Sequence, residues 1–196
     1  MKRKSSMFVF GAAMLSSSML LAQATAPTTN TVGGREENQQ DRIAQGVKSG
    51  QLTAGETKNL EGREANLNRE IHADRAANGG KLTSAERQQI NHQQNNLSKS
   101  ISADKHNAAT QNYKGEVGAR QENQQDRIAQ GIKSGSLSPA EAARAENRQQ
   151  GINQEIRADR AANGGKLTAE EHTQINRQQN AASRQIRREK HDGRGR

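Results

Sequence analysis

The chain has 196 residues, with no cysteine, 2% aromatic residues and a formal net charge of +9 at pH 7. A chain without cysteine has no disulfide framework, no thiol chemistry and no cysteine-based metal site. With so few aromatic residues it also lacks the usual lining of a substrate pocket, which argues against an enzyme.

The first 24 residues have the composition of a secretory signal peptide. Residues 2–4 are Lys-Arg-Lys, an apolar run broken by serines follows at residues 7–22, and Ala-Gln-Ala at residues 22–24 fits a small-x-small cleavage site. The apolar run is short for a membrane span, and no cysteine follows it to carry a lipid anchor. We therefore predict an exported protein, periplasmic or secreted, that begins near Thr25 and has no transmembrane segment.

The rest of the chain is poor in large apolar residues. Seven Leu, ten Ile and three Val make 20 of 172 residues, and Tyr113 is the only aromatic residue there. This fraction is below that of ordinary globular domains. We expect a thin core, and the sequence leaves open an oligomer or a partly disordered chain.

An 85-residue repeat organises the chain. Glu37–Gly46 recurs unchanged at Glu122–Gly131, and Ala73–Thr83 recurs unchanged at Ala158–Thr168. Two blocks this similar predict the same structure twice. The predicted division is a signal peptide at 1–24, a linker at 25–34, helical repeat 1 at 35–106, a linker at 107–118, helical repeat 2 at 119–191 and a basic tail at 192–196.

Each repeat is expected to contain three helices. In the first repeat they run from about Arg35 to Lys48, Ala54 to Ala77 and Ser84 to Lys105, and the longer two carry apolar residues seven and then four positions apart. This spacing keeps a narrow apolar stripe on one helix face, which favours antiparallel hairpins or coiled-coil-like pairs. The predicted fold class is therefore all-α, with two tandem repeats of antiparallel helical hairpins. The remaining faces are rich in Gln, Asn, Arg and Glu and are expected to be contact surfaces.

Four turns of the form Gly-x-Leu-Thr/Ser-x-x-Glu separate these helices. The hydroxyl can accept the N–H of the third helical residue, and the glutamate at that position can reach back to the N–H of the cap. The glycines can take the left-handed conformation that ends the preceding helix. The predicted capping residues are Thr53 with Glu56, Thr83 with Glu86, Ser138 with Glu141, and Thr168 with Glu171.

The second and fourth turns resemble an EF-hand calcium loop. The candidate ligands are Asp74, Asn78 and Glu86 in one turn and Asp159, Asn163 and Glu171 in the other. Such a loop needs several oxygen ligands at fixed spacing, but alanine stands at the third ligand position and the closing glutamate comes one place late. A helix end followed by a new helix start explains the same residues, so we expect no metal site.

Catalytic motifs do not stand out in the chain. It has no Gly-x-Ser-x-Gly nucleophile motif and no phosphate loop, and we expect no carboxylate in an apolar setting that would raise its pKa. The prediction is a non-enzymatic protein without catalytic residues or cofactor.

Positive charge gathers at the C-terminal end of the chain. Basic ends of this kind bind nucleic acid, anionic lipid headgroups or acidic polysaccharides. Export and the lack of stacking aromatic residues argue against nucleic acid. The predicted partner is a protein or an anionic envelope component, and a homo-oligomer stays open. The basic residues are Arg184, Arg187, Arg188, Lys190, Arg194 and Arg196.

The Leu-Thr turns and the glutamine-rich helices that follow them resemble periplasmic chaperones of the Spy/CpxP type. Leu82-Thr83 leads into Gln88-Gln89-Ile90, and Leu167-Thr168 leads into Gln174-Ile175. The resemblance implies ATP-independent shielding of unfolded envelope proteins, although glutamate replaces the glutamine of the family motif. The chain also resembles uncharacterised exported bacterial helical-repeat proteins, which implies no activity. We expect an envelope interaction or structural role, with a Spy/CpxP-like chaperone or a calcium-binding EF-hand-like module as the alternatives.

Overall fold

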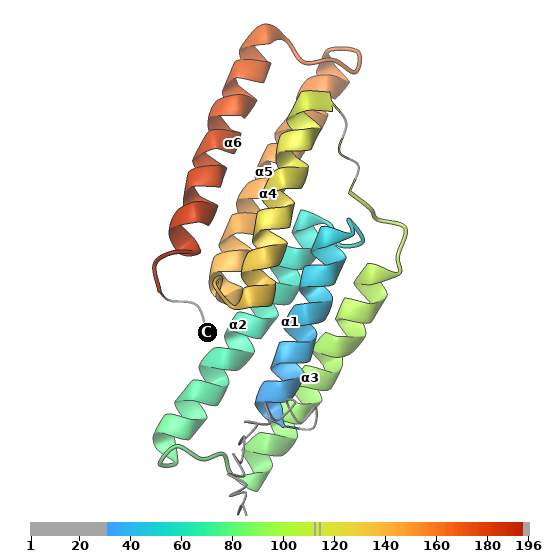
Figure 1. The fold of residues 1–196 in the computed structure, drawn as a ribbon. Helices are drawn as coiled ribbons and strands as arrows, with labels where there is room; N and C mark the ends of the chain where they lie inside the picture. The colour runs from blue at the N-terminus through green and yellow to red at the C-terminus, as the bar shows by residue number, and fades with distance from the viewer. Residues whose placement is uncertain (1–30, 112, 114, 194–196) are drawn as a thin grey trace, which may run out of the picture.

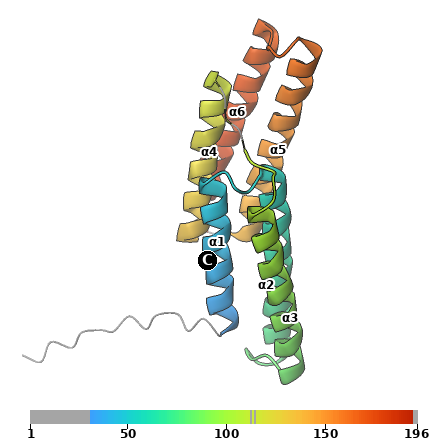
Figure 2. The same cartoon turned by 90° about the vertical axis from the view of Figure 1, so that its right-hand side faces the viewer.

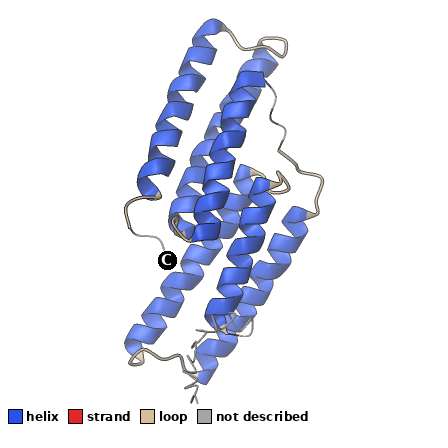
Figure 3. Cartoon of the chain, viewed as in Figure 1, coloured by secondary structure: helices blue, strands red, loops and turns tan. Residues whose placement is uncertain are grey.

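The chain folds into α-helices joined by short turns. The structure, a computed structural model, describes residues 31–111, 113 and 115–193, and all regular secondary structure in these ranges is helical (Figure 3). The all-α prediction is confirmed. The predicted signal peptide at 1–24 lies outside the described residues. The helices are α1 (Val32–Lys48), α2 (Ala54–Ala77), α3 (Ser84–Lys105), α4 (Gly115–Ser134), α5 (Pro139–Ala162) and α6 (Ala169–Glu189).

Two helices begin inside the segments that composition assigned to linkers. α1 starts at Val32 and α4 starts at Gly115. The Thr31 hydroxyl caps the early start of α1, because it accepts the Gly34 N–H at 3.0 Å. The Gln94 amide then donates to the carbonyl oxygen of Val32 at 2.8 Å. A contact with a helix far along the chain therefore holds these glycine-rich residues in a helix, against their low intrinsic propensity.

Consecutive helices run antiparallel, and the two halves of the molecule overlap at its centre (Figures 1 and 2). α1, α2 and α3 form the lower half in Figure 1, and α4, α5 and α6 form the upper half. α2 packs along α5 and α1 packs along α4, and these are the most extensive contacts between helices. α3 packs outside against α1 and α2, and α6 packs outside against α4 and α5. None of the described helices is long and apolar enough to cross a membrane.

One apolar cluster joins the two halves. It takes side chains from all six helices and from two of the turns. The narrow stripes therefore meet the opposite half as well as their hairpin partner, and the few large apolar residues are concentrated at the centre. The cluster contains Ile43, Ala44, Val47, Leu52, Leu60, Leu97, Ile101, Ile128, Ala129, Ile132, Leu137, Ala142, Ala145 and Ile186.

The first and third turns lie in this central core. Leu52 and Leu137 are 0% and 1% exposed, and each packs on a glycine of the preceding helix. A Cβ atom on Gly46 would lie 2.7 Å from Leu52 Cδ1, and one on Gly131 would lie 2.5 Å from Leu137 Cδ1. Glycine therefore stands at both positions, in the last turns of α1 and α4, because the turn leucine leaves no room for a side chain.

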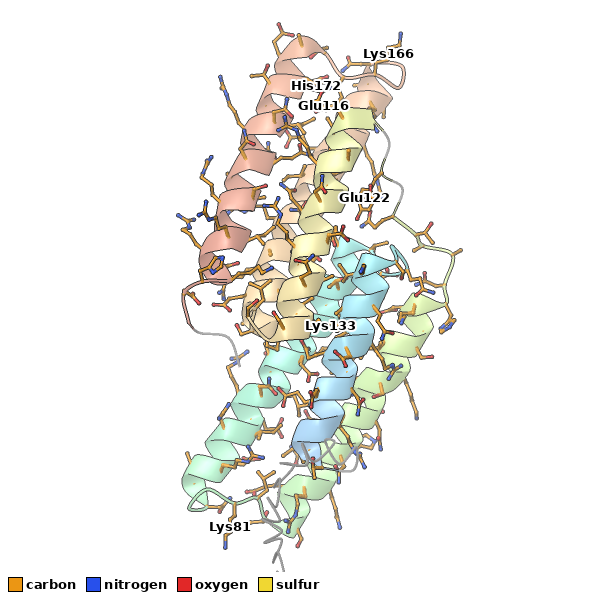
Figure 4. All side chains as sticks on the ribbon, viewed as in Figure 1. Lys81, Glu116, Glu122, Lys133, Lys166 and His172 are labelled. Atoms are coloured by element: carbon orange, nitrogen blue, oxygen red, sulfur yellow. The ribbon has the colours of Figure 1, made fainter. Side chains whose placement is uncertain are left out.

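The second and fourth turns lie at opposite ends of the molecule, where Lys81 and Lys166 project (Figure 4). Their leucines, Leu82 and Leu167, are only partly buried and pack against smaller apolar clusters. One sequence motif therefore serves two environments, the centre and the tips.

Candidate functional site

The predicted capping residues lie at the first turns of four helices. At α3 the Glu86 N–H donates to Thr83 Oγ1 at 3.3 Å, and the Thr83 N–H donates to Glu86 Oε2 at 2.7 Å. At α5 the N–H and the hydroxyl of Ser138 both donate to Glu141 Oε2, at 2.9 and 2.7 Å. These side chains start helices. The reciprocal pairs at α2 and α6 are Thr53 with Glu56 and Thr168 with Glu171.

The candidate calcium residues do not converge as ligands. Asn78 directs its Nδ2 donor at both carboxylate oxygens of Glu86, at 2.8 and 3.0 Å, and a calcium ion needs oxygen atoms instead. Asp74 takes part through its backbone carbonyl, which accepts from Asn78 Nδ2 at 2.8 Å. Among the described residues no group of three or more His, Asp or Glu side chains is arranged to hold a metal ion. The fourth turn repeats the contact between asparagine and glutamate with Asn163 and Glu171, beside Asp159.

Three glutamate side chains of α2 and α5 are completely buried. Glu61 and Glu64 on α2 and Glu146 on α5 are each 0% exposed. Glu146 Oε2 accepts from Gln125 Nε2 at 2.8 Å, and Glu61 Oε2 accepts from Gln40 Nε2 at 3.2 Å. The expectation that no carboxylate lies in an apolar setting is therefore wrong.

The burial of Glu146 changes its charge state. Desolvation raises the pKa of Glu146 from its usual 4.5 to about 8, the Gln125 hydrogen bond opposes this, and the charge of Glu61 adds to it. Glu146 is therefore protonated at neutral pH. Because its side chain is sealed between helices, it has no access to a substrate in solvent. The sequence contains a signal for this burial, because Glu61 and Glu146 occupy the same position in the two repeats and each directly follows a residue of the apolar stripe.

Buried glutamines tie α1 to α3. Gln39 Nε2 donates to the carbonyl of Gln94 at 2.7 Å and to Ser98 Oγ at 2.8 Å. Part of the polar faces that the sequence assigned to contact surfaces is therefore interior. Adjacency to Ile43, which stands four positions after Gln39 on the apolar stripe, could have indicated this burial. The same contacts tie α4 to α6 through Gln124, Gln179 and Ser183.

A groove opens where α1, α2 and the first turn of α5 meet, and we call it the α1–α2 groove. Its volume is about 870 Å³. A second hollow of about 600 Å³ shares Gly33 and Arg75 with it and continues to the second turn, where Lys81, Leu82 and Arg87 line it. The groove is lined by Gly33, Glu36 and Glu37 of α1, Ala65, Asn68, Arg69, His72 and Arg75 of α2, and residues 138–140 of α5.

In the other half, Tyr113 covers the residue that corresponds to the α1 edge of the groove. Gly33 and Gly118 are equivalent, since they stand 85 positions apart. Gly33 is exposed, and a Cβ atom on it would meet nothing within 4 Å. Gly118 is buried, and a Cβ atom on it would lie 2.6 Å from the carbonyl carbon of Tyr113. Among the described residues, nothing covers Gly33 as Tyr113 covers Gly118. Residue 28, which stands 85 positions before Tyr113, lies outside the described part of the chain.

At the α2 edge of the groove, too, the first half carries a smaller side chain than the second half. Ala65 lines the groove, and its equivalent 85 positions later is Gln150. Gln150 Oε1 accepts from Lys58 Nζ at 2.8 Å, and its Nε2 atom lies 2.9 Å from where Gly55 would carry a Cβ atom. The Gln150 side chain therefore reaches across to the first turns of α2, whereas alanine leaves the equivalent space empty.

The basic C-terminal residues divide between a helix face and the chain end. Lys190 Nζ donates to the carbonyl of Arg127 at 3.3 Å, and desolvation, with a further contribution from the Arg127 charge, lowers the pKa of Lys190. Arg194 and Arg196 lie outside the described residues. The exposed basic face is formed by Arg184, Arg187 and Arg188 of α6.

Comparison with known proteins gives no template for either the groove or the buried carboxyls. No protein-family model, curated protein or solved structure matches this chain.

Proposed function

We propose that this chain is a non-enzymatic exported protein that binds a polypeptide of the cell envelope through the α1–α2 groove. The observation that carries the proposal is the groove itself, a hollow of about 870 Å³ between three helices. Concave surfaces framed by rigid helices are the usual places where proteins bind ligands. The equivalent surface of the other half is covered by Tyr113 and crossed by Gln150, so of the two surfaces the α1–α2 groove is the less covered by described residues.

The position of Glu146, the carboxyl with the raised pKa, supports a binding function rather than catalysis. Glu146, with its raised pKa, is fully buried between the halves. A general acid or base has to reach the atom that it protonates or deprotonates. In the groove, the Glu36 carboxylate accepts from Asn68 Nδ2 at 2.7 Å, which braces α1 against α2.

Affinity capture from native envelope fractions tests the proposal. The bait is the full chain, compared with an Ala65→Gln variant that places a longer side chain in the groove. Gly62→Ala is the matched control, since Gly62 lies on the same helix and a Cβ atom there meets nothing within 4 Å. We expect wild type and Gly62→Ala to retain the same polypeptide and Ala65→Gln to lose it. Equal retention by all three baits contradicts the proposal.

A Spy/CpxP-like chaperone is the second candidate, because an open groove also suits an unfolded client. The assay is aggregation of a chemically denatured client protein at near-stoichiometric ratios of the chain. A chaperone suppresses aggregation of unrelated clients. A specific envelope binder leaves their aggregation unchanged and still captures its own partner.

A further inference from the structure

The protein carries its own example of a segment covering this kind of surface. The connection from α3 to α4 runs past the first turn of α2 (Figure 2). Asn107 Nδ2 donates to Glu56 Oε1 at 2.7 Å, and the Gln111 N–H donates to the carbonyl of Gly50 at 3.1 Å. These contacts lead the chain to Tyr113, which lies on Gly118. A non-helical segment thus delivers one aromatic side chain to the covered half.

Tyr113 is partly buried, and its backbone and Cβ atom lie against Gly118 of α4. Its hydroxyl oxygen is buried and has no hydrogen-bond partner among the described residues. Burial raises the pKa of Tyr113, and the nearby carboxyls of Glu146, Glu122 and Asp126 add to this. These carboxyls belong to α5 and α4, so the Tyr113 hydroxyl lies within electrostatic reach of both helices. The equivalent helices, α2 and α1, border the open groove.

The α1–α2 groove and the hollow that continues it are, taken together, more basic than acidic. Arg69, Arg75, Lys81 and Arg87 line the groove and the hollow that continues it, against Glu36 and Glu37. The Glu36 carboxylate is engaged by Asn68. A partner segment with acidic residues therefore complements the groove in charge.

We propose that the α1–α2 groove binds an extended polypeptide segment of a partner by taking up a tyrosine side chain that is flanked by acidic residues. This inference rests on the proposed function and specifies its ligand. A tyrosine supplies a large, rigid apolar surface at a low entropic cost, and main-chain atoms beside it can lie along the exposed edge at Gly33.

Titration calorimetry of the full chain with short blocked peptides tests the inference. The probe peptide has one tyrosine between aspartates. One control peptide has alanine in place of the tyrosine, and another has lysines in place of the aspartates. The proteins are wild type, Ala65→Gln and Gly62→Ala.

We expect wild type and Gly62→Ala to bind the probe peptide equally. Replacing the tyrosine with alanine, replacing the aspartates with lysines, or introducing Ala65→Gln should each weaken binding by at least about tenfold. Equal binding of the alanine peptide, or no binding of the probe peptide, overturns the inference.

The two proposals fail in different ways. If Ala65→Gln abolishes envelope capture but the probe peptide does not bind, the groove recognises another chemistry and only the tyrosine assignment is wrong. If Ala65→Gln changes neither capture nor peptide binding, the groove is not the binding surface and both proposals are wrong.

Discussion

Glu146 of α5 lies within electrostatic reach of Glu61 of α2, and both side chains are completely buried where the halves of the molecule meet. Glu61 and Glu146 are equivalent positions of the 85-residue repeat, so the same carboxyl group is buried in each half. Glu146 accepts an amide hydrogen bond from Gln125, and Glu61 accepts an amide hydrogen bond from Gln40, each within its own half. A proton on Glu146 removes one negative charge and so weakens the repulsion between the two buried side chains.

This arrangement predicts that the protein is more stable in acid than in base. The pKa of Glu146 is about 8 in the folded chain and 4.5 is its usual value, so between these pH values the folded state binds more protons. The contribution to the free energy of unfolding is therefore fully present below pH 4.5, falls as pH rises and is lost above pH 8. At ~1.4 kcal/mol per pH unit, the total reaches about 5 kcal/mol. Thermal unfolding measured from pH 4.5 to pH 9 checks it.

The variant that isolates this effect is Glu146→Gln, which keeps the shape of the side chain and cannot ionise. Its melting temperature should vary less with pH than that of wild type and should exceed it at pH 9. Glu170→Gln, at an exposed carboxyl in the first turn of α6, should keep the wild-type pH profile. A Glu146→Gln profile parallel to that of wild type refutes the role of Glu146.

Replacing glycine with alanine should change stability in opposite directions at two pairs of helix positions. Gly46→Ala and Gly131→Ala force a Cβ atom against a turn leucine, so each should destabilise the chain by about 1–3 kcal/mol. Gly62→Ala and Gly151→Ala place a Cβ atom in open space on a helix and should stabilise it by about 0.5–1 kcal/mol. Urea unfolding of the four variants measures the difference, and changes of one sign in both pairs contradict the packing.

The buried glutamines predict that a polar substitution can act like a core mutation. Gln39→Ala removes two hydrogen bonds and leaves the Ser98 hydroxyl without that donor, which should cost about 2–3 kcal/mol of unfolding free energy. Gln45→Ala on the exposed face of the same helix should change stability by less than about 0.5 kcal/mol. Chemical denaturation compares the two, and similar losses show that the amide network contributes little.

The turns at the tips predict no response to calcium. Asn78 and Asn163 direct amide donors at Glu86 and Glu171, so ion binding has to break these contacts first. Far-ultraviolet circular dichroism and the melting temperature should be the same in millimolar calcium and in chelator. A rise in melting temperature with calcium restores the EF-hand interpretation.

Local signals predicted the longer helices, whereas long-range contacts decided the rest. α2 and α3 begin and end at the predicted residues because caps such as Thr83 and glycines such as Gly80, at φ +88°, act within one turn. The early start of α1 depends on Gln94, 62 positions beyond Val32. The faces rich in Gln, Asn, Arg and Glu are expected from the sequence to be contact surfaces, whereas Gln39 and Glu146 are buried. Residue type alone does not show what a neighbouring helix covers.

Sequence patterns within one helix could not predict the groove either, because it also depends on contacts between distant parts of the chain. It arises from how the halves overlap and from where the connection carrying Tyr113 runs. Comparing the two repeats does reveal part of the difference, since the equivalent positions 65 and 150 carry side chains of different size, Ala65 and Gln150. Only the placement of α1, α2 and α5 shows that this difference lies on a surface.

The most direct test of an open groove beside a covered counterpart is photocrosslinking in the native envelope. Benzoylphenylalanine is placed in the full chain at Ala65 or, in a second protein, at Gln150, and crosslinked peptides are identified by mass spectrometry. We expect position 65 to crosslink to a partner polypeptide beside a tyrosine, and position 150 to crosslink only within the chain. The same partner crosslinks from both positions, or none from position 65, contradict this expectation.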